Sequence, residues 1–289
     1  MILVTGATGN LGSAVVNELL NRVEAKDIAV LVRDEAKVAG LKQKGVQVKV
    51  GSYDNYNSLV EAFKGINSLL LVSGNDMANR IKQHENVVKA AKEANVGRVV
   101  YTSTQRVTEG KESAIAFFSD SHIATEKMIK ESGLSFTILK DCLYMEVLPL
   151  FMGDKVIETG TIYLPAEDGK VAFASRADMA QGAAIVLSSK GHENKVYEFG
   201  NEIAVGFDEI AQILSKLSGK EITYVSPTQE DFVKTLKEIG VPQEGIAITA
   251  GFSKGIAEGE LNTPTHDLKD LLGHELISLQ TYLKGAYNL

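Results

Sequence analysis

The feature of this sequence that most restricts its fold is the regular alternation of short apolar runs with longer amphipathic segments. The apolar runs are ILVT (2–5), IAVLV (28–32), VQVKV (46–50), SLLLV (68–72), RVVYTS (98–103) and FTIL (136–139). Runs that are apolar almost throughout are typical of strands buried on both faces, and helical crossovers between such strands predict parallel pairing. The pattern therefore predicts a doubly wound α/β sheet of the Rossmann type.

The alternation ends after Leu143. Short β-like pieces (GTIYL, KVAFA, KVYEFG) then alternate with helical patterns, and from Pro242 onward the chain reads as helix interrupted by glycines. We expect a Rossmann domain over residues 1–148 and a smaller, mostly helical substrate-binding lobe over residues 149–289. A segment near 171–200 is expected to return to the sheet.

Composition excludes several classes of function. The net charge of −7 argues against a nucleic-acid-binding surface, which would need a basic stripe. No apolar run approaches the length that spans a membrane, and MILVTGATG begins a strand almost at once, so no signal peptide is expected. Because Cys142 is the only cysteine, no internal disulfide is possible, and a reducing cytoplasm is the expected setting.

A glycine-rich loop, GATGNLG (6–12), joins the first predicted strand to the first predicted helix. Gly6 permits a tight turn, Gly9 lets the backbone approach a pyrophosphate, and Gly12 allows the helix to pack closely on the strand. The helix N-terminus then presents free N–H groups to phosphates. Glycines also occur in tight turns without a ligand, but the position inside a βαβ unit favours a dinucleotide site.

The second strand is followed by Arg33, at the place where the adenosine ribose of a dinucleotide is recognised. Arginine suits a 2′-phosphate by its charge and its forked donors, and Lys37 lies one turn further on. We therefore favour NADPH as cofactor. Asp34 leaves NADH open, and Arg33 pairing with Asp34 or Glu35 at the surface is the non-functional alternative.

Several further motifs follow in a specific order, and together they carry a family resemblance. They are LVRDEAK, GSYDNYNSLVEAFKG, QHENVVKAAKEANVGRVVYTS, SHIATEK, SGLSFTILK and GHENKVYEF. With the glycine loop, the chain resembles the NmrA-like atypical short-chain dehydrogenases, and within them the bacterial NAD(P)H:quinone oxidoreductase and triphenylmethane reductase type. The resemblance covers nearly the whole chain and implies a Rossmann fold with NADPH as reductant. Relatives of this type are often homodimers, but the residues here leave the oligomeric state open.

The resemblance also implies a set of cofactor contacts. The diphosphate would lie on Gly6, Thr8, Gly9, Asn10, Leu11 and Gly12, and the 2′-phosphate on Arg33. Ser73 and Gly74 would pass near the link between phosphate and ribose. Thr102 and Ser103 would lie near the nicotinamide ribose, and Lys140 is a further cofactor-binding candidate.

Two positions depart from the pattern of the family. Relatives commonly have Asp-Tyr after the third strand, whereas this chain has Ser52 and Tyr53, followed by Asp54. Relatives often end the sixth strand with Arg-Asn, whereas this chain has Lys140 and Asp141. The first departure puts the adenine contact in question. The second places a negative charge close to the expected position of the nicotinamide and the acceptor.

The stretch SHIATEK (121–127) decides which acceptors are plausible. Reduction of a ketone needs a Tyr acid whose pKa is lowered by a Lys four residues later, and here those positions are His122 and Glu126. A quinone gives a far less basic anion, and a cationic triphenylmethane dye needs no proton. The missing YxxxK pair therefore favours an acceptor that mainly needs positioning and hydride.

Two residues are candidates for contact with the acceptor. His122 could donate a hydrogen bond to the acceptor's oxygen, or its helix face could simply pack beside the cleft with Glu126 salt-linked. Tyr144 could stack on a flat acceptor, or close the core between the lobes. The other histidines lack metal-ligand spacing.

The sequence thus predicts an NADPH-dependent reductase that takes a small-molecule quinone or similar aromatic acceptor, with neither nucleic acid nor membrane as partner. A non-catalytic, NADP(H)-sensing regulatory protein of the same family is the alternative. Chemistry of the sugar-nucleotide type is disfavoured by the absent YxxxK.

Overall fold

The computed structural model describes all 289 residues, and at its centre lies a seven-stranded parallel sheet. Its strands are β1 (Ile2–Val4), β2 (Ile28–Val32), β3 (Gln47–Val50), β4 (Ser68–Leu71), β5 (Arg98–Thr104), β6 (Ser135–Asp141) and β9 (Lys195–Phe199). Every neighbouring pair runs parallel. The predicted doubly wound α/β fold is confirmed.

The order of the strands places a crevice at one edge of the sheet. The order is β3-β2-β1-β4-β5-β6-β9, so the chain winds outward from β1 in one direction and then returns to start again at β4. The crossovers after β1 and β4 diverge to opposite sides of the sheet, and the carboxyl ends of these two strands flank a gap. Ligands of open α/β sheets bind at such a switch point.

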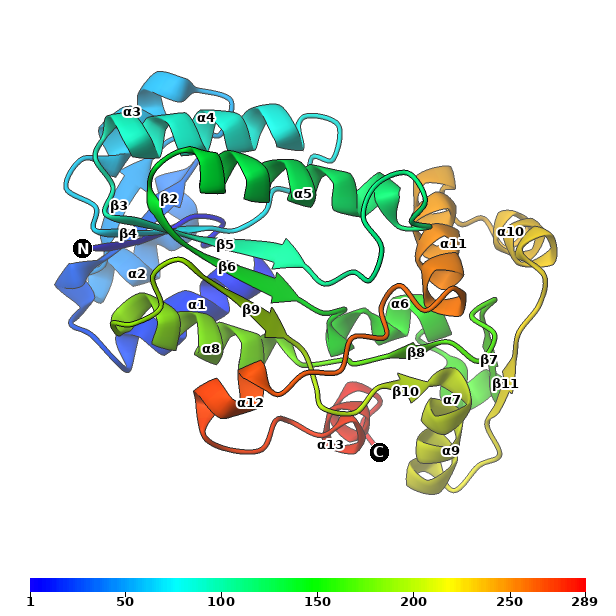
Figure 1. Ribbon diagram of the computed structural model, residues 1–289. Helices are drawn as coiled ribbons and strands as arrows, with labels where there is room; N and C mark the ends of the chain where they lie inside the picture. Colours follow the sequence, from blue (N-terminus) through cyan, green and yellow to red (C-terminus); the bar gives the residue numbers. More distant parts are fainter.

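Helices cover both faces of the sheet (Figure 1). One face carries α1 (Asn10–Leu20), α8 (Arg176–Ser188) and α12 (Asp267–Leu272), and the other carries α3 (Tyr56–Phe63), α4 (Arg80–Glu93) and α5 (Ala116–Glu131). Val30 of β2 belongs to the first core and its neighbour Leu31 to the second. Because successive residues of each strand are buried on opposite faces, the strands read as continuous apolar runs.

The remaining elements form a lobe with a core of its own, which includes Met145, Phe173, Phe207 and Phe252. Two small sheets, β7 with β11 and β8 with β10, lie among its helices. The elements are η3 (Met145–Val147), α6 (Leu148–Met152), α7 (Val156–Thr159), β7 (Thr161–Tyr163), β8 (Lys170–Val171), β10 (Val205–Gly206), α9 (Phe207–Ser218), β11 (Thr223–Val225), α10 (Gln229–Glu238), α11 (Gln243–Ala257) and α13 (Leu279–Ala286). Short helices η1 (Ala25–Asp27), η2 (Glu35–Val38) and α2 (Ala39–Gln43) flank β2.

The chain does not divide once between sheet and lobe. α8 and β9 lie within the segment expected near 171–200, and β9 pairs with β6 at the edge of the sheet. α12 also packs on the sheet side, where Leu268 is buried against α8. Gly182 makes this approach possible, because a Cβ there would stand 2.7 Å from Leu268 Cδ1. None of the helices is both long and apolar enough to span a membrane.

Candidate active site

The glycine loop lies at the crevice and leaves donors pointing out of it. Gly6 adopts φ of +61°, a left-handed conformation that glycine adopts without strain. A Cβ on Gly12 would stand 2.3 Å from the carbonyl oxygen of Gly6, so the first turn of α1 sits directly on the loop. The N-cap, Gly9, offers no side chain, and the N–H groups of Asn10 and Leu11 have no hydrogen-bond partner in the chain. These are the features of a phosphate cradle.

Arg33 lies at the outer end of the same cavity, where β2 ends. Its side chain is exposed and forms no ion pair. The two acids that follow are otherwise engaged: Asp34 accepts a hydrogen bond from the N–H of Ala36, and Glu35 pairs with Lys42 at 3.3 Å. The surface pairing considered for Arg33 is therefore absent, and its guanidinium is free to meet an anion.

The residues after β3 supply a carboxylate in spite of the departure at Ser52. The Ser52 hydroxyl donates to Asp54 at 3.3 Å, and Gln83 Nε2 donates to the other oxygen of the same carboxylate at 3.0 Å. Asp54 and Ser52 both line the cavity. Tyr53 faces inward, where its hydroxyl donates to the carbonyl of Val72 at 2.9 Å. An acid thus stands two residues later than in the family pattern.

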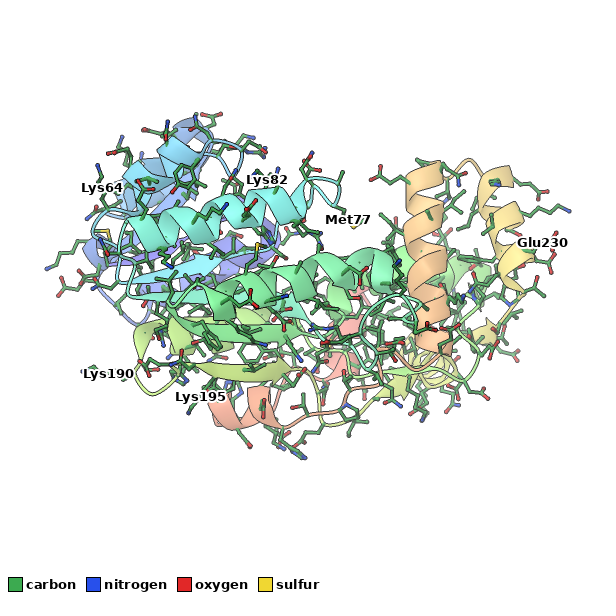
Figure 2. The ribbon with its side chains drawn as sticks, turned by 45° about the horizontal axis from the view of Figure 1, so that its top comes forward. Lys64, Met77, Lys82, Lys190, Lys195 and Glu230 are labelled. Atoms are coloured by element: carbon green, nitrogen blue, oxygen red, sulfur yellow. The ribbon has the colours of Figure 1, made fainter.

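The segment between β4 and α4 is fastened to the sheet at its start. The N–H of Ser73 donates to Thr102 Oγ1 at 3.0 Å, and the N–H of Gly74 donates to His84 Nε2 at 3.1 Å. Burial lowers the pKa of His84 to about 3, so its ring stays neutral and can accept. Arg80 Nε donates to the Gly74 carbonyl at 2.6 Å. Further along this segment, Met77 reaches the side nearest α11 (Figure 2).

His122 and Glu126 share a buried face of α5, as their spacing predicts, but neither lines the cavity. The His122 ring is 1% exposed, and its two nitrogens lie 2.8 Å from the Tyr101 hydroxyl and 3.2 Å from Arg80 Nη1. Burial, reinforced by Arg80, holds the pKa of His122 well below its usual value. The ring is therefore a neutral part of the wall behind the cavity.

Glu126 belongs to a buried ion pair. Arg106 Nη1 donates to its carboxylate at 2.8 Å, and Ser103 Oγ donates to the same oxygen at 2.5 Å. These bonds outweigh burial and lower the pKa of Glu126. Ser103 thus faces Glu126, while Thr102 reaches the cavity. Lys140 also lies away from it, because its ammonium pairs with Glu198 of β9 at 3.0 Å.

The inner half of the cavity is apolar and aromatic. Tyr144 lines it, with the Arg176 guanidinium 4.6 Å above its ring and its hydroxyl donating to Asp141 at 2.9 Å. The ring centroids of Phe118 of α5 and Phe252 of α11 lie 5.2 Å apart. A helix of the sheet layer and a helix of the lobe therefore form this wall together. The other lining side chains here are Leu143, Val147, Leu150, Phe151 and Ile248.

Both halves belong to one cavity of about 690 Å³, within the usual range for small-molecule sites. It brings together Gly6, Thr8, Gly9, Asn10, Leu11, Gly12, Arg33, Ser73, Gly74, Thr102 and Tyr144 among the predicted residues. It leaves out Ser103, His122 and Lys140. No group of three or more His, Cys, Asp or Glu side chains is placed to hold a metal ion.

Sequence reasoning missed most residues of the apolar half and two arginines; Arg80, Phe118, Arg176 and Phe252 are the ones that shape the cavity most. Arg80 is only 4% exposed, yet nothing in QHENVVKAAKEA or the residues before it distinguishes this arginine from a surface one. Phe118 and Arg176 each stand within the first turn of a helix that begins at the cavity, which is a weak signal. Phe252 lies far along the chain and is brought in by lobe packing.

A model of the NmrA-like family matches residues 1–256. Along its full length the chain is 36% identical to quinone oxidoreductase 2 of Escherichia coli, of which it covers 99%. It is 30% identical to the NAD(P)H azoreductase of Xenophilus azovorans, over 84% of this chain and 82% of that one.

Solved structures give the same picture. The NADPH-dependent quinone oxidoreductase of Escherichia coli, complexed with NADPH, matches with a TM-score of 0.93 and 36% identity over 100% of both chains. The Citrobacter sp. triphenylmethane reductase complexed with NADP(H) matches with a TM-score of 0.91 and 36% identity over 99% of both chains.

Proposed function

Because this chain belongs to the NmrA-like family, we propose that it is an NADPH-dependent reductase that passes hydride to quinones or similar flat aromatic acceptors. The observation that carries the proposal is the two-part cavity. One half offers free backbone donors and an unpaired arginine, and the other offers an aromatic wall. A charged dinucleotide and a flat apolar acceptor need this combination.

The residues of the polar half fit NADPH. The unpartnered N–H groups at the start of α1 would bind the diphosphate, and Arg33 would bind the 2′-phosphate through its forked donors. Ser73 and Gly74 would lie along the bound cofactor, and Thr102 near its nicotinamide end. Two of the similar solved structures hold NADPH or NADP(H), which supports this choice over NADH. When bound, the reduced nicotinamide supplies the hydride.

The apolar half fits a flat acceptor. Phe118, Tyr144 and Phe252 present aromatic surface from three elements, and Leu150, 62% exposed, extends apolar surface to the mouth. Aromatic side chains that converge on one space favour stacking of a planar ring. Holding that ring against the cofactor is a large part of the catalysis of hydride transfer.

The reductase we propose works without a YxxxK relay. His122 and Glu126 stand where a Tyr and a Lys would be expected, and both are committed to buried bonds outside the cavity. The proposed acceptors suit this arrangement, since a quinone gives a weakly basic anion and a cationic dye needs no proton. We further propose a cytoplasmic setting, consistent with the single, buried thiol of Cys142.

The test is oxidation of NADPH, followed by its absorbance, with and without 1,4-benzoquinone or a cationic triphenylmethane dye, and repeated with NADH. We expect turnover that depends on the acceptor and favours NADPH. Arg33→Ala should reduce the preference for NADPH over NADH by about 10- to 100-fold, from the roughly 1.5–3 kcal/mol that charged hydrogen bonds contribute. Arg22→Ala, an exposed arginine without a partner, is the matched control.

Two results would contradict the proposal. Equal losses for both cofactors in Arg33→Ala would remove the 2′-phosphate assignment. Tight binding of NADPH without turnover on quinones, azo compounds or dyes would instead favour the sensing protein.

A further inference from the structure

Asp141 is a buried carboxylate with one hydrogen-bonded partner. It ends β6 and is 4% exposed. The only hydrogen bond to its side chain comes from the Tyr144 hydroxyl, at 2.9 Å, and no Lys, Arg or His forms an ion pair with it. Its neighbours across the sheet are Thr104 of β5 and Phe199 of β9, neither of them charged. A carboxylate so placed is poorly solvated when ionised.

Tyr144 connects this carboxyl group to the cavity. Its ring lines the apolar half, while its hydroxyl turns to Asp141. Arg176, at the start of α8, covers the ring at 4.6 Å. Tyr144 is therefore the one hydrogen-bonded link between the buried carboxyl group and the cavity wall, and its phenol oxygen can both accept a proton and give one up.

The pKa values of this couple and of its neighbour Cys142 are all raised, and burial is the largest cause for each. Burial raises the pKa of Asp141 to about 7. Burial raises the pKa of the adjacent Cys142 thiol well above its usual value, and the pKa of Tyr144 likewise, with the charge on Asp141 as a further cause for both. Glu146 accepts hydrogen bonds from the backbone N–H of Arg176.

We infer that Tyr144 and Asp141 form a proton relay that completes the reduction of a quinone, an inference that rests on the proposed function. Hydride from the reduced nicotinamide brings two electrons to the quinone and leaves a hydroquinone oxyanion. Tyr144 breaks its O–H bond and gives the proton to that oxyanion. Asp141 then gives its carboxyl proton to the Tyr144 oxygen, and once the hydroquinone has left, the carboxylate regains a proton from water through the same Tyr144 hydroxyl. The sum is quinone plus reduced nicotinamide plus one proton, giving hydroquinone plus oxidised nicotinamide.

The relay predicts that acceptors differ in their need for it. A quinone takes up a proton, whereas hydride neutralises a cationic triphenylmethane dye without one. Asp141→Asn keeps the size of the side chain and removes the acidic proton of the carboxyl group. Tyr144→Phe removes the hydroxyl and keeps the ring. Asp120→Asn is the matched control, since Asp120 is exposed on α5 and forms no side-chain hydrogen bond.

The experiment measures kcat for 1,4-benzoquinone and for a cationic dye from pH 5.5 to 8.5, with NADPH, in H2O and D2O. In the wild type, quinone turnover should fall as pH rises through about 7 and show a solvent isotope effect. Asp141→Asn and Tyr144→Phe should lower the quinone-to-dye ratio of kcat at least tenfold at pH 6 and lose both signatures. The double variant should lose no more than either single one, and Asp120→Asn should behave as wild type.

Each alternative result is decisive. An unchanged ratio and pH profile in both variants would overturn the relay while leaving the reductase intact, because the dye would still be reduced. A loss only in Tyr144→Phe would overturn the part of Asp141, because the Tyr144 hydroxyl would then act without the carboxyl group behind it. Failure of the wild type on both acceptors would overturn the proposed function, and the relay with it.

Discussion

The buried carboxyl group of Asp141 should make the stability of this protein depend on pH in a way that one substitution removes. The pKa of Asp141 rises from 3.8 to about 7 on folding, because burial disfavours its ionised form. The native state therefore holds this proton more tightly than the unfolded state does. The contribution of Asp141 to the free energy of unfolding is therefore largest below about pH 4 and declines as pH rises through about 7.

The size of the effect follows from the shift. A difference of about three pKa units corresponds to about 4 kcal/mol, at 1.36 kcal/mol per unit, and the whole amount is lost between pH 4 and pH 8. An asparagine at position 141 can still accept the hydrogen bond from Tyr144 and carries no charge at any pH. Relative to Asp141→Asn, the wild type should therefore lose about 4 kcal/mol of unfolding free energy over this range.

The assay is urea denaturation of both proteins without cofactor, at intervals from pH 4 to pH 8, followed by circular dichroism. Other titrating groups contribute equally to both proteins, so the difference between the two curves isolates position 141. Two parallel curves would refute the reasoning, since they would mean that the Asp141 carboxylate is solvated or paired with a cation in solution. A variant that is less stable at every pH would mean that the ionised carboxylate is the favoured partner of Tyr144.

Three other substitutions test separate parts of the structure. Gly12→Ala would place a methyl group 2.3 Å from the Gly6 carbonyl oxygen, so we expect the loop to shift and NADPH affinity to fall at least tenfold in a fluorescence titration; unchanged affinity would contradict the placement of the loop. Glu126→Gln should destabilise the fold by about 1–3 kcal/mol in urea, because Arg106 loses its buried partner and keeps only the exposed Glu109, at 2.6 Å, as counter-charge, and a variant as stable as wild type would count against the buried pair. Phe118→Ala should raise KM for a quinone about 2- to 10-fold, from the roughly 0.5–1.5 kcal/mol of one aromatic contact, and an unchanged KM would exclude Phe118 from the acceptor site.

The sheet and the geometry of the glycine loop could be predicted because their signals are local. A strand such as β2 is buried on both faces, and its run of apolar residues shows this. Gly6 is needed for its own φ of +61°, and Gly12 for its close approach to the Gly6 carbonyl oxygen, six residues earlier. The spacing of His122 and Glu126 also predicted correctly that they share a face. It could not predict which way that face turns, since this depends on how α5 lies against β5.

The apolar half of the cavity could not be predicted in the same way. Phe252 reaches it because α11 packs across the end of α5, and that packing joins residues from distant parts of the chain. Arg80 is buried because the segment after β4 folds back over it, where the carbonyl of Gly74 accepts a hydrogen bond from Arg80 Nε. Neither arrangement leaves a periodicity or a motif in the residues themselves.

The interleaving of sheet and lobe has a mechanical consequence. The chain passes from β6 into the lobe, returns for α8 and β9, leaves again for α9 to α11, returns for α12 and ends in the lobe at α13. Two domains joined by one linker can rotate about it in a hinge motion. Domains joined by several chain crossings resist both bending and twisting. We therefore expect a preformed cavity that does not close by domain motion, so that an acceptor enters and leaves past Leu150 with little rearrangement of the backbone.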